Sequence, residues 1–174
     1  WNGSIGDMYL LNGPLVHIES IQLYPDIGKQ EVKAVIRITS PGQLKSSIEM
    51  DVFARSVKPA PRHATGPVHG NFTLKGGTDT IEMILPMGPE LNTWDEFDPH
   101  LYNFTAELSH NGEKSRKTVR FGMREISTRG KQILVNGNPV FMRGNVDCAV
   151  FPLTGYPAMD VKSWLKIFGQ LKAF

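Results

Sequence analysis

Alternation of apolar and polar residues over roughly the first 125 positions constrains the fold of this chain more than any other feature. In the run EVKAVIRI, every second residue is apolar, and the positions between carry Glu, Lys and Arg. Successive side chains of a β-strand point to opposite faces, so such a run predicts a strand with one buried face. The predicted strands of this kind are 31–38, 48–55, 80–85, 102–108 and 117–123.

The segment 15–24 is a further apolar stretch, but its alternation changes parity between Ile18 and Ile21. A β-bulge inserts one extra residue into a strand and shifts the alternation by one. We therefore predict a strand here with a bulge near Glu19 and Ser20.

Turn signals rich in Gly, Pro and Asn separate these runs, and no helical period lies between them. About seven short strands joined by such turns predict an all-β protein with a two-sheet antiparallel sandwich of about 100 residues. The stretch 58–70 contains three Pro and two Gly, and we predict a long loop there.

After residue 125 the pattern changes. The pair Asn136-Gly137 between two apolar runs is a strong signal for a two-residue β-hairpin. A strand over 139–144, a loop, and a helix over 161–174 with Asp160 as its N-cap then follow. This order is a β-loop-α unit, which is typical of the beginning of an α/β fold.

The predicted helix has one apolar face. We expect that face to fold onto the sandwich or to pack on another copy of the chain, because a bare apolar patch promotes association. The residues on it are Val161, Trp164, Leu165, Phe168 and Leu171.

Composition narrows the possible functions. The net charge of +2 is too small to indicate binding to nucleic acid or to an anionic membrane, and no apolar run reaches the length of a membrane span. The single cysteine, Cys148, excludes an internal disulfide and a multi-cysteine zinc site but is compatible with a periplasmic or secreted location, which we favour. No phosphate-binding Gly loop is present, and we expect no cofactor and no metal.

The chain starts at Trp1 rather than Met, and we expect it to be a piece of a longer protein.

Several polar groups could suggest chemistry, but each has a simpler interpretation. Asp95, Glu96 and Asp98 lack the ligand spacing of a calcium loop and precede a predicted strand, so we interpret them as a polar loop above Trp94. His63 and His69 stand in the predicted 58–70 loop without a third ligand and make a poor metal pair. Cys148 has no nearby partner that would activate a nucleophile.

Two motifs near the C-terminal end resemble glycoside hydrolase family 2, which contains β-galactosidases, β-glucuronidases and β-mannosidases. They are FGMREI at 121–126 and ILVNGNPVFMRGNVD at 133–147. In that family an immunoglobulin-like sandwich ends in a strand of the first type. A hairpin of the second type then opens a (β/α)8 catalytic barrel. The segment TWDEFDPHLYNFTAEL at 93–108 is similar to a strand entry of the same sandwich.

The resemblance implies three parts: 1–13 as the end of a preceding sugar-binding domain, 14–125 as an immunoglobulin-like sandwich, and 126–174 as the hairpin with the first strand and helix of the barrel. It implies a retaining exo-glycosidase, β-galactosidase-like, that degrades carbohydrate. The Asn-Glu acid/base motif and the nucleophilic Glu of the family lie farther downstream. We therefore expect this chain alone to be inactive and assign no catalytic residue to it.

Because active sites of such barrels lie at the C-terminal ends of the strands, any contact with the glycan substrate is expected near Asn145, Asp147 or Cys148. Many family members have a His where this chain has Cys148, which is a departure from the galactosidase type. The partners implied are the sugar-binding and barrel domains of the same chain, and no nucleic acid or membrane. Self-association would use Trp164, Leu165, Phe168 and Leu171.

Two alternatives stay open. The chain could be a free-standing carbohydrate-binding or adhesion module, for which Trp94 and Tyr102 are the plausible aromatic platform. It could also be a spacer without ligand contact.

Overall fold

The computed structural model describes residues 8, 10, 12–42, 45–57, 62–142, 144, 146, 151 and 153–173. The chain divides into two compact units, one comprising 12–141 and the other comprising 142–174 together with 1–11. The strands of the first unit are β1 His17–Asp26, β2 Glu31–Ser40, β3 Ser46–Ser56, β4 Ala64–Leu74, β5 Gly77–Pro86, β6 Tyr102–His110, β7 Glu113–Phe121, β8 Ile126–Arg129, β9 Gln132–Val135 and β10 Asn138–Pro139.

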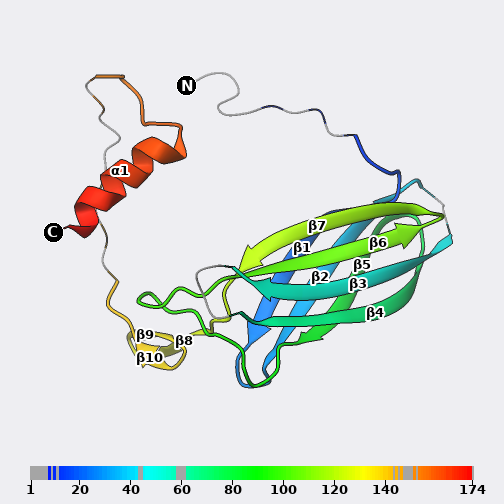
Figure 1. Ribbon diagram of the computed structural model, residues 1–174, viewed down its shortest axis with the longest axis horizontal. Coiled ribbons are helices and arrows are strands. Elements are labelled where there is room, and N and C mark those ends of the chain that lie inside the picture. Colours follow the sequence, from blue (N-terminus) through cyan, green and yellow to red (C-terminus); the bar gives the residue numbers. More distant parts are fainter. Residues whose placement is uncertain are drawn as a thin grey trace. The chain divides into compact units, whose positions relative to one another are not determined.

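Strands β1 to β7 form a sandwich of two antiparallel sheets, as the alternation predicts. One sheet has the order β1-β2-β5 and the other the order β4-β3-β6-β7. Figure 1 shows the four-stranded sheet lying over the three-stranded one. At the open sides of the two sheets, β1 lies beside β7 and β4 lies beside β5.

The apolar residues of the alternating runs fill the space between the sheets. In β2 the side chains of Val32, Ala34, Ile36 and Ile38 are 0% exposed, and β3 and β6 bury their apolar faces in the same way. Burial of this extent is the main favourable contribution to folding of a domain of this size. Between the sheets, the Ile18 N–H donates a hydrogen bond to Ser115 Oγ at 3.0 Å, which links β1 to β7.

The bulge in β1 is confirmed: the pairing of β1 with β2 shifts register between Ile18 and Ser20. Tyr102, at the start of β6, is fully buried, and its hydroxyl accepts a hydrogen bond from the Asn92 N–H at 2.8 Å. This bond back to the preceding loop resembles the tyrosine corner of immunoglobulin-like domains.

The prediction of a loop over 58–70 is wrong for its second half, because β4 begins at Ala64. Pro67 cannot donate a hydrogen bond to a sheet, but β4 is an edge strand, which has one side without a partner and tolerates proline. Residues 58–61 lie outside the described part of the chain.

A two-residue hairpin forms at Asn136-Gly137, as predicted, and belongs to a small sheet with the order β10-β9-β8. The strand predicted over 139–144 is shorter than expected, since β10 ends at Pro139 and residues 140–142 are not in a strand. A first barrel strand is held by parallel neighbours. The part of the chain that the structure describes offers β10 only the antiparallel β9.

The second unit contains α1, Val161–Lys172, which agrees with the predicted helix up to Lys172, and Ala173 is its C-cap. Asp160 is its N-cap, as predicted: its carboxylate accepts hydrogen bonds from the Ser163 N–H at 2.8 Å and from the Ser163 hydroxyl at 2.7 Å. These bonds hold the pKa of Asp160 below its usual value, the hydroxyl bond most of all.

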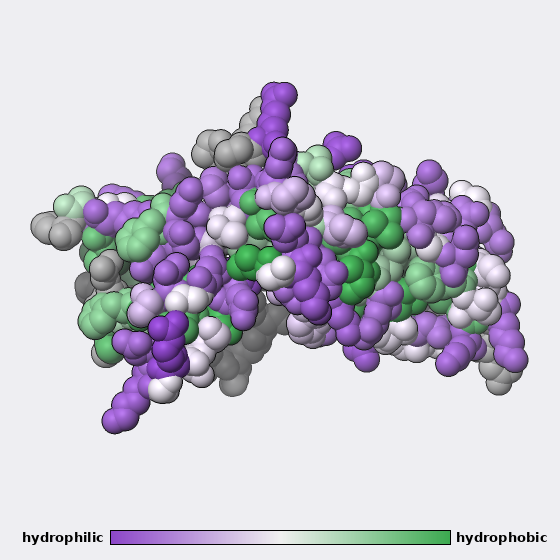
Figure 2. Space-filling view, turned by 90° about the horizontal axis from the view of Figure 1, so that it is seen from below, coloured by the Kyte–Doolittle hydropathy of each residue, from purple (hydrophilic) through white to green (hydrophobic). Residues whose placement is uncertain are grey.

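Figure 2 shows a surface on which hydrophobic side chains lie among polar ones. Within the described residues, no helix has the length and apolarity needed to cross a membrane.

Candidate functional site

The three residues predicted to lie nearest a substrate, Asn145, Asp147 and Cys148, are outside the described residues. Their role therefore stays a prediction. Among the residues that the structure does describe, two features could serve function: a junction between the sandwich and the hairpin, and two hollows on the outer faces of the sheets.

The junction, which we call the Trp94 junction, consists of Trp94, Gly122, Arg124, Glu125 and Asn136. It brings together the connection between β5 and β6, the end of β7 and the turn of the hairpin. The Trp94 N–H donates to the carbonyl of Met123 at 2.9 Å, beside a parallel bridge between Thr93 and Met123. These contacts fix the loop against the segment that leaves the sandwich.

The indole of Trp94 is half-buried and packs against that same segment. A Cβ placed on Gly122 would lie 2.7 Å from Trp94 Cβ, which is closer than atoms can approach, so glycine permits this packing. The guanidinium carbon of Arg124 lies 4.5 Å from the centre of the indole ring, a cation–π contact. Trp94 therefore has a packing role at this junction.

Asn136 ties the hairpin to both other segments. Its backbone is left-handed, with φ at 53°, and Gly137 follows with φ at 78°, as a type I′ turn requires. Its Nδ2 donates to the carbonyl of Trp94 at 3.0 Å, and its Oδ1 accepts from the Glu125 N–H at 3.0 Å. Its own N–H donates to the carbonyl of Glu125 at 2.9 Å. One asparagine thus forms the turn and also anchors it.

The Trp94 junction has the chemistry of a joint rather than of a reaction centre. Among its five residues, Glu125 alone carries a carboxylate. Retaining glycoside hydrolysis needs two carboxyl groups about 5 Å apart. What the arrangement can do is hold the hairpin against the sandwich.

The carboxylates near Trp94 have local structural roles. Asp95 Oδ1 accepts hydrogen bonds from the N–H groups of Phe97 at 2.8 Å and Asp98 at 2.7 Å, which closes a turn. Asp98 Oδ2 lies 2.8 Å from His100 Nε2. These contacts agree with a polar loop leading into β6.

The two histidines of the predicted 58–70 loop separate in the structure. The ring of His63 packs edge-on against Tyr102, with 5.5 Å between ring centres. His69 stands on β4 and its Nδ1 is 3.0 Å from Asp51 Oδ1. The hydrogen bond to Asp51 raises the pKa of His69 above its usual value, with the charges of Asp51 and Glu49 contributing.

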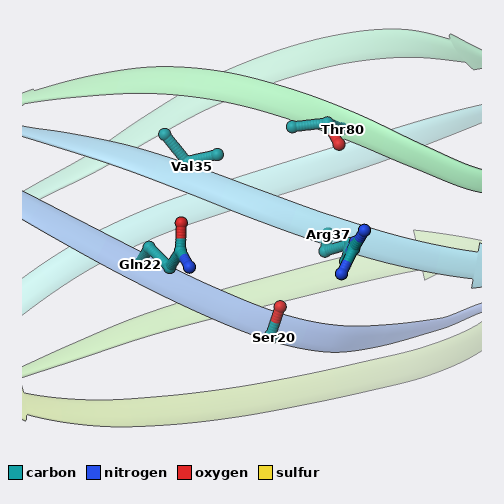
Figure 3. A pocket seen from close by; sticks show the side chains of 5 residues that line it. All are labelled: Ser20, Gln22, Val35, Arg37 and Thr80. Atoms are coloured by element: carbon teal, nitrogen blue, oxygen red, sulfur yellow. The ribbon is translucent and has the colours of Figure 1, made fainter.

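One hollow, of about 250 Å³, lies on the outer face of the three-stranded sheet. Figure 3 shows its side chains, which come from neighbouring strands: Ser20 and Gln22 from β1, Val35 and Arg37 from β2, and Thr80 from β5. Arg37 Nε is 3.9 Å from Glu19 Oε2, a loose and exposed ion pair. The five lining residues include no aromatic side chain.

The other hollow, of about 280 Å³, lies on the outer face of the four-stranded sheet beside Phe53. Phe53 occupies the same alternate positions as the charged residues Asp51 and Arg55 and was not among the predicted site residues. An aromatic at an outward position of an otherwise charged face is the signal that could have identified it.

Comparisons with protein families, curated proteins and solved structures all point to one family. A family model described as glycosyl hydrolases family 2 matches residues 16–124. A curated β-galactosidase from Alteromonas mediterranea is 24% identical over 147 residues, which is 82% of this chain and 14% of that protein. The chain thus spans a small part of the length of this relative.

Solved structures of the same family share the fold. A family 2 β-galacturonidase from Eisenbergiella tayi, bound to galacturonate, superposes with a TM-score of 0.70 at 21% identity, covering 91% of this chain and 27% of that one. A β-glucuronidase from Bacteroides uniformis has a TM-score of 0.63 at 16% identity, covering 92% and 19%. With the family model spanning more than half of its residues, the chain belongs to glycosyl hydrolases family 2.

Proposed function

We propose that this chain is the non-catalytic immunoglobulin-like part of a longer retaining exo-glycosidase of the β-galactosidase type. In this proposal, 1–13 end a sugar-binding domain, 14–125 are the sandwich, and 126–174 begin the catalytic barrel. The Alteromonas relative is named a β-galactosidase, which supports the class, and the chain covers only 14% of it. The solved relatives include a β-galacturonidase and a β-glucuronidase, so the sugar is left open.

The observation that carries this proposal is the anchoring of the hairpin by Asn136. A hairpin that merely followed the sandwich would need no bonds to the loop before β6. Instead its turn accepts and donates hydrogen bonds to Glu125 and Trp94. Such a joint is what a domain requires when it must hold the next domain in a fixed orientation.

The first test is an activity assay of the purified chain with nitrophenyl β-galactoside, β-glucuronide, β-galacturonide and β-mannoside. We expect no turnover, because the sequence has no Asn-Glu motif to supply the acid/base carboxylate. Hydrolysis of any of the four substrates would overturn the assignment of this chain as non-catalytic.

The second test concerns the substrate-proximal residues and uses the longer enzyme. We expect Asp147→Ala to lower kcat/KM, because the proposal places Asp147 at the C-terminal end of the first barrel strand. Glu113→Ala, at the exposed first position of β7, is the matched control. Unchanged kinetics of the Asp147 variant would remove this residue from the site.

The alternative of a free-standing carbohydrate-binding or adhesion module makes a different prediction. Titration of the chain with oligosaccharides would then give a dissociation constant tighter than millimolar. Of the two aromatic residues that could serve such a module, Tyr102 is fully buried, and Trp94 is half-buried and packs against Gly122 and Arg124.

A further inference from the structure

Phe53 stands at the centre of the outer face of the four-stranded sheet. It lies on β3, which β4 and β6 flank, and it is half-buried. The outward residues around it are polar or charged, and among the described outward positions of this sheet it is the one Phe, Tyr or Trp. Packing within the sandwich does not require an aromatic ring on this side.

A bulge opens space next to the ring. Val52 pairs with Val68 and Ala54 pairs with Thr65, so Gly66 and Pro67 of β4 together oppose the single residue Phe53. Gly66 has φ at 90°, and a Cβ there would lie 2.9 Å from Phe53 Cβ. Glycine therefore lets β4 pass close to Phe53, beside the hollow of about 280 Å³.

Two carboxylates border the same hollow. Asp51 and Glu107 are direct cross-strand partners of β3 and β6, and like charges in this position are unfavourable. Each is paired through one oxygen: Asp51 Oδ1 with His69 Nδ1 at 3.0 Å, and Glu107 Oε1 with Arg116 Nε at 3.4 Å. Their other oxygens, Oδ2 and Oε2, make no hydrogen bond to any residue that the structure describes.

A cation completes the lining. The guanidinium carbon of Arg55 is 5.5 Å from the centre of the Phe53 ring. Arg55 is exposed and can donate hydrogen bonds to a ligand beside the ring. The hollow therefore combines one aromatic ring, two carboxylate acceptors and one guanidinium that can donate several hydrogen bonds.

We propose that the hollow between Phe53, Arg55, Asp51 and Glu107 is a weak binding site for a neutral pyranose unit of a glycan. The apolar C–H face of a pyranose packs on an aromatic ring, and its hydroxyls donate to carboxylates and accept from a guanidinium. This site lies on the sandwich itself and is independent of any catalytic barrel, so it does not rest on the function proposed above.

The two carboxylates of the site should determine whether it binds a neutral sugar or a uronic acid. A uronic acid would bring a third carboxylate close to Asp51 and Glu107, and like-charge contacts of this kind disfavour binding. The site should therefore prefer a neutral pyranoside to the corresponding uronate. Because the hollow is open and buries only part of a sugar, the dissociation constant should be in the millimolar range.

The test is a titration of the full chain with methyl β-D-galactopyranoside, in which two-dimensional NMR monitors the amide shifts. We expect saturable shift changes in the amides around Phe53 on β3, β4 and β6. Phe53→Ala should weaken binding at least tenfold, and Glu107→Gln, which preserves shape, should weaken it severalfold. D-galacturonate should bind more weakly than the neutral sugar.

Two control variants keep the test specific. Phe97→Ala removes an exposed aromatic of the β5–β6 loop, and Arg37→Ala alters the hollow of Figure 3. Both should bind the sugar as the unchanged chain does. The proposal is wrong if no saturable shifts occur, if they lie elsewhere, or if Glu107→Gln and Phe53→Ala leave binding unchanged in folded protein. An equal or stronger response to galacturonate would overturn the selection for neutral sugars.

Discussion

Strand β2 and helix α1 both carry a regular apolar stripe, but they differ in what covers it. The four apolar side chains of β2 are 0% exposed between the two sheets. In α1 no residue is buried among those described, and Leu165 and Phe168 are 66% and 53% exposed. The helix does have local order, because Trp164 stacks on Phe168 with 5.6 Å between ring centres. The sandwich thus completes its own core, whereas the described residues of the helix's own unit do not bury the stripe of α1.

Removal of a buried aromatic ring from the core of the sandwich should have the largest effect. Phe104→Ala on β6 should lower the free energy of unfolding by about 3–5 kcal/mol, since it removes a fully buried ring. The matched variant Phe168→Ala in α1 should change the unfolding of the sandwich by less than about 0.5 kcal/mol. Urea denaturation followed by Trp fluorescence and far-UV circular dichroism measures both. Similar losses in the two variants would show that the sandwich depends on α1.

The next effect concerns the Trp94 junction. Asn136→Gly keeps the left-handed backbone and removes only the carboxamide, which makes bonds to Trp94 and Glu125. We expect a loss of about 1–3 kcal/mol in the local stability of the hairpin, because two hydrogen bonds are lost that contribute roughly 0.5–1.5 kcal/mol each. Hydrogen exchange of the β8 and β9 amides measures it. Asn138→Gly in the exposed β10 is the control, and equal protection in both variants would disprove the anchoring role.

A third prediction addresses the uncovered stripe of α1. We propose that the chain self-associates through Trp164, Leu165, Phe168 and Leu171. Leu165→Glu should weaken this association at least tenfold, because it places a charge in an apolar contact. Sedimentation equilibrium over a range of concentrations tests this, with Leu153→Glu, an exposed position outside the stripe, as control. A chain that stays monomeric at all concentrations would contradict it.

The smallest expected effect is a pH dependence of the folding stability. It comes from the pair of His69 and Asp51 on the outer face of the four-stranded sheet. The pKa of His69 is raised in the folded protein by Asp51, so protonated His69 stabilises the fold. This contribution is complete below the unfolded pKa of about 6.5 and is lost as pH rises through the higher folded pKa. The urea midpoint should fall slightly more between about pH 6 and pH 8.5 in the unchanged chain than in His69→Gln. Identical pH profiles would show that the pair contributes nothing measurable.

Much of the fold could be predicted because it depends on local periodicity. The alternation of 31–38 and 48–55 gave the buried faces of β2 and β3, and a break in parity gave the bulge of β1. The strand β4 was missed because Gly66 and Pro67 are turn residues in most contexts. An edge strand with a bulge accepts both, but a sequence does not reveal which strand is at an edge.

The candidate site was less predictable. Asn136 was identified as a turn residue, but its bond to Trp94 joins residues 42 positions apart, and no periodic pattern contains such a contact. The alternation in β3 predicts which face is buried, but it does not distinguish Phe53 from the other outward residues. The strand predicted over 139–144 was too long, since β10 ends at Pro139 and pairs with the antiparallel β9.

Hydrogen exchange of the whole chain, at a concentration low enough to prevent association, tests most directly whether the sandwich is self-sufficient and α1 is not. We predict that the amides of β2, β3 and β6 exchange only through global unfolding, whereas those of α1 exchange orders of magnitude faster through local opening. Protection of α1 should increase as the concentration of the chain rises. Equal protection of α1 and β2 in the dilute monomer would contradict this conclusion, because it would mean that the chain already covers the helix.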